Sequence, residues 1–439
     1  MRFLKVMRNI RGSFWYLPAL YSIAAFILAL ITIRFDFIIT SNQDFSKFVP
    51  DFLLADESLS QTLLSSISTA LLTMTTITFS SILVVLTTFL SNFSPRTLQN
   101  FITDHSTQRV LGIFVGGFVY TVILLLLLRE TDTKSLFLAP SFAIFVTFIC
   151  LTVFIFFVHH TSKWIQVGVL ISTISTGTKK IIEEKLKNKE IEQSGLEETN
   201  LVSIEDQEPL KLSAQLPGYI NSIDKDTIKE IAERYDGVVR IEKNHGDFVN
   251  SDSLLFSVWN ANSNEIIHEL YNCISIEPNR APYQNIEFGL TKLVEIALRA
   301  ISPAVNDPNT AVNCIEQIGS LLSELGKKQL PKPMEFDKCG NLRLISEQWI
   351  FSDYLYFCFY QIRHYGNEDI SIIRVILKAL ILIAEGNDSD IKQSVWEFSS
   401  YILEGIELKK MLSLDRRYLN DVILQLANTC ERQHEFKTI

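Results

Sequence analysis

The segment from residue 62 to residue 91 is one long apolar stretch that can form a single uninterrupted helix. It contains no charged residue, no glycine and no proline. At about 1.5 Å per residue the helix would be roughly 45 Å long, against about 30 Å for the hydrocarbon core of a bilayer. The segment therefore predicts a membrane-spanning helix.

Hydroxyl side chains recur every three or four positions along this segment, a spacing that places them on one helix face. We call this line the hydroxyl stripe: Thr62, Ser66, Thr69, Thr73, Thr76, Ser80, Thr87 and Ser91, with Val84 in its one gap. Such hydroxyls either bond to their own helix and pack against a neighbour, or line a water column between copies of the chain. In a water column, apolar constrictions at Phe79, Leu83 or Val84 would act as a gate by excluding water.

Three more apolar runs predict spans, which gives four in all. They extend from Phe14 to Ile33, from Val110 to Leu128 and from Leu136 to Val158. The N-terminus is basic, so it is expected in the cytoplasm, and four crossings return the C-terminus to the same side. The first run is too long for a signal peptide and lacks a small-residue cleavage site, so it predicts an anchor. No span carries an acidic or basic residue in its core, and no inverted repeat is visible, which disfavours a secondary transporter.

The chain after residue 160 has the charge density of a soluble protein. A net charge of −9 and a pI near 5.4 argue against nucleic acid as a partner. The sequence therefore predicts a four-helix transmembrane domain over 1–160 and an amphipathic helix with an acidic linker over 161–209. A small β-rich domain over 210–280 and an α-helical cytoplasmic domain over 281–439 follow. The amphipathic helix is expected either to lie on the membrane or to bundle with copies of itself.

Short alternating strands are predicted after Leu210, with a short helix from Asp226 to Tyr235 between them. The phrases Gly237-Val238-Val239 and Gly246-Asp247-Phe248-Val249 resemble half of a lipoyl/biotinyl-like barrel-sandwich domain. That family attaches its cofactor to a lysine at a hairpin tip, and Lys225 lies at a comparable place. However, Lys225 continues into the predicted helix, for which Asp224 or Asp226 is the better N-cap, so we expect no cofactor.

The remaining chain predicts helices from Ile286 onward, and one of them has a clear start signal. Asp307 precedes Pro308, the arrangement of an N-cap followed by proline at the first helical position. Candidate sensing residues for pH or a ligand are His159, His160, Arg299, Asn306 and Asp307. We find no phosphate loop, nucleophile motif or paired metal-ligand spacing, so the chain is not expected to be an enzyme and no metal site is predicted.

Several phrases together resemble the bacterial membrane family of unknown function known as DUF2254. They are Leu90-Ser91-Asn92-Phe93-Ser94-Pro95-Arg96, Phe157-Val158-His159-His160, the stretch from Gly218 to Asp224, Gly246-Asp247-Phe248-Val249, and the stretch from Leu298 to Pro308. Asn92 stands where the family pattern has Gln, a change that keeps the amide. The resemblance implies an integral protein of the bacterial inner membrane with a cytoplasmic domain, and it assigns no activity.

Two functions remain open at this point. The first is a homo-oligomeric ion channel whose pore is lined by the hydroxyl stripe and whose cytoplasmic part forms a vestibule or sensor. The second is a membrane-anchored binding or scaffold protein without transport activity. Both have the lipid bilayer as a partner, and only the first needs ions and copies of the chain.

Overall fold

The computed structural model describes residues 15–41, 50–92, 105–128, 137–164, 166–187, 208–260, 264–278, 285–406 and 411–439. Its chain forms two compact units, Met1–Leu170 and Ile171–Ile439. Each unit has its own architecture and is treated by itself below.

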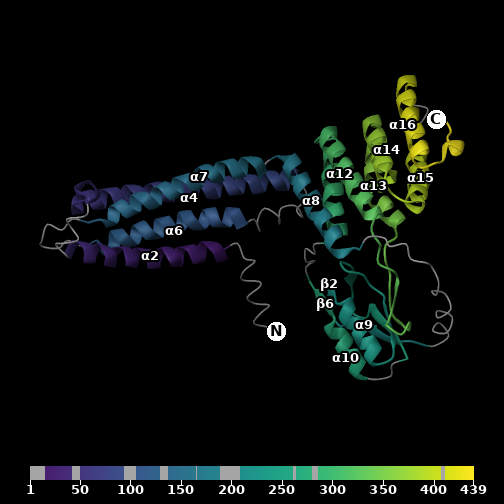
Figure 1. The fold of residues 1–439 in the computed structure, drawn as a ribbon, viewed down its shortest axis with the longest axis horizontal. Helices are drawn as coiled ribbons and strands as arrows, with labels where there is room; N and C mark the ends of the chain where they lie inside the picture. The colour runs from purple at the N-terminus through teal and green to yellow at the C-terminus, as the bar shows by residue number, and fades with distance from the viewer. Residues whose placement is uncertain are drawn as a thin grey trace. The chain divides into compact units, whose positions relative to one another are not determined.

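Four long helices make up the first unit, and they confirm the four predicted apolar helices. They are α2 (Tyr16–Ser41), α4 (Glu57–Asn92), α6 (His105–Leu127) and α7 (Ala139–Trp164), with the short 3-10 helix η1 (Asp51–Leu53) before α4. The helices run side by side, and α6 packs against α2, α4 and α7 (Figure 1). Each one is long and apolar enough to cross a membrane.

Glycines on α6 allow its close packing against α2. A Cβ atom on Gly112 would lie 2.8 Å from the ring of Tyr21, and one on Gly116 would lie 3.2 Å from the Tyr21 carbonyl oxygen. On another side of α6, a Cβ on Gly117 would lie 3.0 Å from the Cys150 sulfur of α7. Small residues thus let these backbones approach, as is common between membrane helices.

In the described part of the second unit, eight strands form two sheets. The strands are β1 (Leu210–Ser213), β2 (Gly218–Ile223), β3 (Val238–Ile241), β4 (Phe248–Val249), β5 (Leu254–Trp259), β6 (Ile274–Glu277), β7 (Met334–Phe336) and β8 (Leu342–Ser346). One sheet has the order β1-β5-β3-β8-β7 and the other β4-β2-β6. All pairs are antiparallel except β3 with β8.

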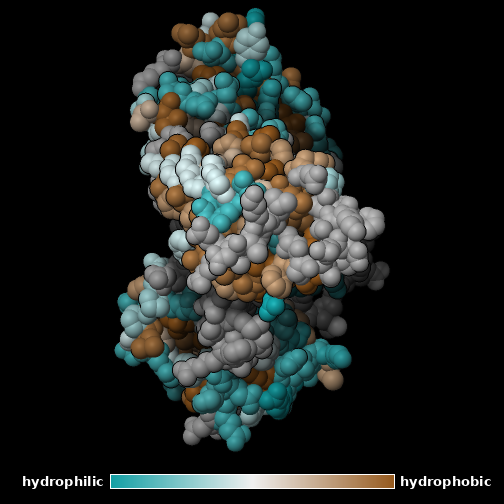
Figure 2. All heavy atoms as spheres, turned by 90° about the vertical axis from the view of Figure 1, so that its left-hand side faces the viewer, coloured by the Kyte–Doolittle hydropathy of each residue, from teal (hydrophilic) through white to brown (hydrophobic). Residues whose placement is uncertain are grey.

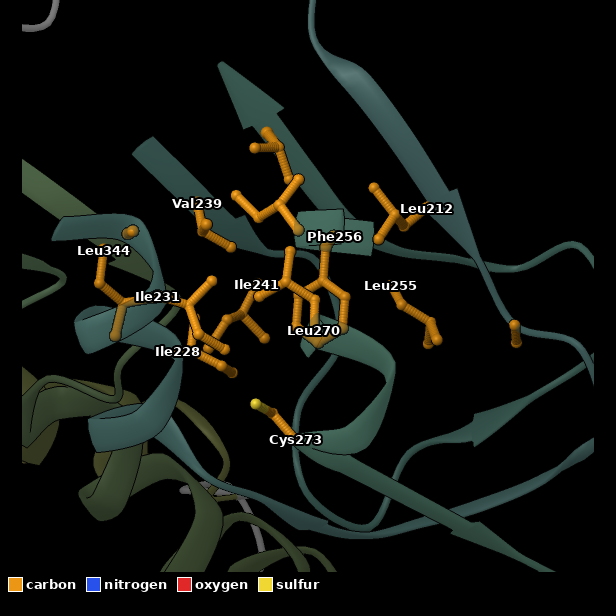
Figure 3. Close-up of a cluster of buried hydrophobic side chains, with 14 of the residues drawn as sticks. Leu212, Ile228, Ile231, Val239, Ile241, Leu255, Phe256, Leu270, Cys273 and Leu344 are labelled. Carbon is orange, nitrogen blue, oxygen red and sulfur yellow. The ribbon is translucent and has the colours of Figure 1, made fainter. Parts of the chain in front are cut away.

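The predicted barrel-sandwich is not confirmed. The larger sheet takes β7 and β8 from chain that lies far beyond residue 280. Helices α9 (Lys225–Arg234) and α10 (Asn264–Asn272) contribute to the core of this region: Figure 3 shows Ile231 and Leu270 in the same cluster of buried side chains as Phe256. The cause is that the apolar faces of these two helices need burial, so they fill space that a pure sandwich would close with strands.

Lys225 begins α9 and does not lie at a hairpin tip. Asp224 is the N-cap of this helix, as predicted, because its carboxylate accepts a hydrogen bond from the Thr227 amide at 3.1 Å. The Lys225 ammonium donates to the Ser346 hydroxyl at 3.4 Å, and burial lowers the pKa of Lys225. The lysine therefore lies in a polar contact between α9 and β8.

Helices form the rest of the second unit: α11 (Ile286–Ala300), α12 (Pro308–Gly326), α13 (Phe351–Gly366), α14 (Ile370–Ala384), α15 (Ser389–Glu404) and α16 (Ser413–Thr429). The 3-10 helix η3 (Gln433–Glu435) follows them. Helix α14 packs against α12, α13, α15 and α16 (Figure 1). These helices confirm the helical character predicted for the chain after Ile286.

Helix α8 (Val167–Lys185) is the predicted amphipathic helix, and its apolar face is buried. Ile171, Ile174 and Ile182 are almost fully buried within the structure, whereas Lys179 and Lys180 are exposed. This placement differs from both expected ones, a helix on the membrane or a bundle of copies. The apolar face is covered within the same chain.

Candidate functional site

Helix α4 packs against the rest of the bundle with one narrow face. Leu64, Leu71, Thr78 and Val85 recur every seven residues on it and are at most 1% exposed. This face contacts α6 and α7. The seven-residue spacing is typical of a helix that keeps one seam against its neighbours.

The hydroxyl stripe lies on the opposite face of α4. Thr69 and Thr76 flank Leu71 and Thr78 by two positions, which corresponds to about 160° around the helix. All members with described side chains are exposed: Thr62, Ser66, Thr69, Thr73, Thr76, Ser80 and Thr87. Ser91 ends the stripe, and its side chain lies outside the described residues. The stripe therefore points away from the bundle that its own chain builds.

The hydroxyls of the stripe are largely satisfied by their own helix. Each of six donates a hydrogen bond to the carbonyl oxygen four residues earlier, at 2.6 to 2.9 Å. The six are Thr62, Ser66, Thr69, Thr73, Thr76 and Thr87. This bond removes the cost of an unpaired donor in an apolar medium, while each oxygen keeps lone pairs for water or a neighbouring hydroxyl.

The outward faces of the other helices have a different composition. On α2, Ile31 and Phe37 are 58% and 68% exposed, and no hydroxyl between residues 16 and 39 is exposed. On α7, Phe148 and Ile155 are 63% and 65% exposed, and Thr152 is the one exposed hydroxyl between residues 139 and 158. In Figure 2, which faces the end of the bundle, brown apolar spheres lie next to pale spheres of weaker polarity.

The three candidate gate residues are all outward-facing, at different angles to the stripe. Val84, Leu83 and Phe79 lie about 40°, 60° and 100° around the helix from Ser80, at 100° per residue. They are 63%, 48% and 42% exposed. Val84 belongs to the stripe's face, Leu83 to its edge and Phe79 to its flank, so Val84 is the strongest gate candidate.

The candidate sensing residues are divided between the two units, with the two histidines in the first and the other three in the second. His159 is exposed near the end of α7, and the His160 ring stacks on Phe156 with centroids 5.5 Å apart. Arg299 lies in the last turn of α11 in the second unit. Among the described residues, no group of three or more His, Cys, Asp or Glu side chains could hold a metal ion.

Asp307 has the structural role that its sequence predicts. It caps α12, with its carboxylate accepting from the Thr310 amide at 3.2 Å and from the Thr310 hydroxyl at 2.6 Å. Asn306 precedes it with a φ of 49° in the left-handed region, which asparagine tolerates better than most residues. Arg299 makes no ion pair with Asp307 in the described chain, and it lies in the last turn of α11.

One polar feature of the bundle was not predicted. Helix α2 continues beyond Ile33 to Ser41, which places Asp36 inside the bundle at 5% exposure. Its carboxylate accepts hydrogen bonds from the Leu138 and Ala139 amides at 2.8 and 3.4 Å, so it caps the start of α7 from another helix. The sequence signal was an acidic residue close to the end of an apolar run, and only the fold shows what it bonds.

Comparison with known proteins places the chain in a family. A family model described as a predicted membrane protein, DUF2254, matches residues 11–381. The chain belongs to the DUF2254 family. Among curated relatives, the uncharacterized proteins Mb1321c of Mycobacterium bovis and Rv1290c of Mycobacterium tuberculosis are each 27% identical over 328 residues. The match covers 73% of this chain and 62% of either relative, so the chain spans less than two thirds of their length.

No solved structure matches the chain. The family description agrees with the four apolar helices, and together they support the conclusion that this DUF2254 chain is a membrane protein. The relatives' names state no activity, so any function must be argued from the residues of this chain.

Proposed function

We propose that this DUF2254 protein is a homo-oligomeric pore of the bacterial inner membrane, with α4 of each copy facing a shared axis. The carrying observation is the outward placement of the hydroxyl stripe, opposite the seam through which α4 packs in its own chain. A face of this polarity fits a position between copies better than a position against lipid tails.

The composition of the neighbouring helices supports this choice. Helices α2 and α7 present aliphatic and aromatic side chains outward, which is the pattern of lipid contact. If α4 faced lipid as well, its outward face should also consist of aliphatic and aromatic side chains. Among exposed apolar residues such as Leu72 and Ile77, it presents seven described hydroxyls, each of which gains nothing from lipid and keeps an acceptor for water.

The stripe lacks formal charge, so the proposed pore would stabilise ions or small polar solutes by hydroxyl dipoles only. Val84, in line with the stripe, would narrow the path with an apolar ring and block flow when dry. In this proposal both termini lie in the cytoplasm, the second unit senses a signal, and the protein is not an enzyme.

The test is solute and ion flux through proteoliposomes that contain the full-length protein. Thr76→Leu and Ser80→Leu should each reduce flux at least about tenfold, because a ring of leucines raises the barrier to hydration. The matched control is Thr152→Leu, which removes an exposed, helix-bonded hydroxyl from α7, where Thr152 donates to the Phe148 carbonyl at 2.9 Å. Thr152→Leu should conduct like the original protein.

Equal flux in all four proteins would remove α4 from the permeation path. No flux from any of them, at any pH, voltage or membrane tension applied, would favour the second function, a membrane-anchored binding or scaffold protein. In that case the hydroxyls would serve helix packing.

A further inference from the structure

Most of helix α8, from residue 171 onward, belongs to the second unit, where it contacts α11. At its centre, the Thr178 side chain occupies the space that a Cβ atom on Gly289 of α11 would need, and such an atom would lie 2.9 Å from Thr178 Cβ and Cγ2. The glycine therefore makes a hole into which Thr178 fits. The Thr178 hydroxyl donates to the Ile174 carbonyl at 2.8 Å, which satisfies it inside this contact.

Two further observations place the C-terminal end of α8 near the C-terminal end of α12. The pKa of Glu324 on α12 is lowered, mainly by a hydrogen bond from Lys327 and additionally by the charge of Lys179 on α8. The Lys187 carbonyl, just after α8, accepts a hydrogen bond from the Gln329 amide at 2.9 Å. Because α8 meets both α11 and α12, it should move with them as one body.

The chain leaves little slack at the other end of α8. Helix α7 ends at Trp164 and α8 begins at Val167, so the connection from one helix to the other spans at most about 11 Å when extended. The start of α8 is therefore tied closely along the chain to the end of α7.

We propose that α8 is the coupling helix of this protein, clamped by the Gly289–Thr178 contact so that movement of the second unit reaches α7. The inference deepens the proposed pore, since it names the segment through which a cytoplasmic signal would reach the membrane helices. The clamp itself rests on the contacts of α8, and it can be tested without measuring flux.

The first measurement is the docking of α8. A cysteine in place of Ile182, which is fully buried on α8, reports undocking by its rate of reaction with a maleimide. The background carries Cys339→Ser, because Cys339 is the exposed native cysteine. Adding Gly289→Ala should raise the labelling rate about tenfold or more, since the new methyl group displaces Thr178.

Two matched variants control this measurement. Adding Thr178→Ala to Gly289→Ala removes the obstructing side chain and should restore protection of the probe. Gly177→Ala adds the same methyl group to α8 where nothing lies within 4 Å, and it should leave protection unchanged. Ile174→Asn weakens the buried face from the α8 side alone, so it tests docking if Gly289→Ala disturbs the fold of α11.

The second measurement is the coupling to α7. A spin label on a cysteine in place of His159, which is exposed near the end of α7, should become more mobile in Gly289→Ala and return to its original spectrum in the double variant. An unchanged spectrum despite increased labelling at position 182 would overturn the coupling. Unchanged labelling in both Gly289→Ala and Ile174→Asn would overturn the clamp.

Flux separates this inference from the pore. If Thr76→Leu blocks flux and Gly289→Ala changes it by about threefold or more, the coupling reaches the pore. If Thr76→Leu blocks flux and Gly289→Ala leaves it unchanged, the coupling is overturned as a route to the gate while the pore stands. If no protein conducts, the pore falls, and the two probes alone decide the clamp and the coupling to α7.

Discussion

The outward face of α4 and the outward faces of α2 and α7 belong to one four-helix bundle, yet they differ in composition. Phe148 and Ile155 on α7 and Ile31 on α2 are large, apolar and more than half exposed. The outward face of α4 carries the hydroxyl stripe in addition to exposed apolar side chains such as Leu72. In the proposed pore, this difference in composition would reflect a shared axis next to α4 and lipid next to α2 and α7.

The difference also shows that polarity and burial need not go together in a membrane protein. In α4, Leu64 and Leu71 face the inside of the bundle and the hydroxyl stripe faces outward, and hydrogen bonds to the preceding turn satisfy most of its hydroxyls. Composition alone cannot say whether such a face touches water, lipid or a second copy. Four predictions address that choice.

The largest expected effect is on thiol reactivity. In a Cys339→Ser background, a cysteine in place of Thr73 should react with a charged, water-soluble thiosulfonate at least about tenfold faster than one in place of Phe148, because the thiolate forms only where water is present. A cysteine in place of Leu71, fully buried on the same helix, should also be protected. Similar slow rates at all three positions would place the hydroxyl stripe away from water.

Cross-linking between copies should separate the same two faces. Oxidation of a Thr69→Cys or Thr73→Cys protein in membranes is expected to give disulfide-linked dimers, whereas Phe148→Cys should remain monomeric. Cross-links together with reactive thiols favour a pore, and cross-links with protected thiols favour dry packing between α4 helices. The absence of cross-links at both stripe positions would mean that α4 faces lipid.

A third prediction concerns the contact that turns the apolar face of α2 outward. Gly112→Leu should destabilise the bundle by about 1–3 kcal/mol, because its side chain must displace Tyr21 at the α2–α6 contact. Ala24→Leu enlarges an exposed position of α2 and should leave stability nearly unchanged. Thermal unfolding of the detergent-solubilised protein measures both. Equal stability of the two variants would contradict the close packing of α2 on α6.

The smallest effect distinguishes two threonines on α4. Thr78 is fully buried, and its hydroxyl has no hydrogen-bond partner within the described chain, so Thr78→Val should stabilise the protein by about 1 kcal/mol. Thr69 is exposed and bonded to the Ser65 carbonyl, so Thr69→Val should change stability by less than about 0.5 kcal/mol. A loss of stability in Thr78→Val would show that its hydroxyl has a partner in the assembled protein.

Much of the local structure follows from the sequence because the signals are short-range. The apolar runs fix four helices, and Asp307 followed by Pro308 fixes the start of α12. Asp224 likewise predicts the start of α9. The spacing of Gly112 and Gly116 indicates a close helix contact, although it does not name α2 as the partner.

Long-range pairings could not be predicted in this way. The strands β7 and β8 join a sheet formed more than 70 residues earlier, and β8 pairs in parallel with β3, for which no local pattern gives a signal. The prediction of a barrel-sandwich used only the local patterns of residues 210–280. It could not include this pairing, and it was not confirmed. Asp36 shows the same limit, since its partners at Leu138 and Ala139 lie about a hundred residues away.

The sequence by itself determined that α4 carries a hydroxyl face and that α8 carries an apolar one, because helical periodicity depends only on residue spacing. The tertiary structure decided what each face meets within the chain. It buries the apolar face of α8 and turns the hydroxyl stripe of α4 outward, since the seam of Leu64, Leu71, Thr78 and Val85 is the face that fits α6 and α7. Periodicity can define a face, but only packing against other elements gives it a direction.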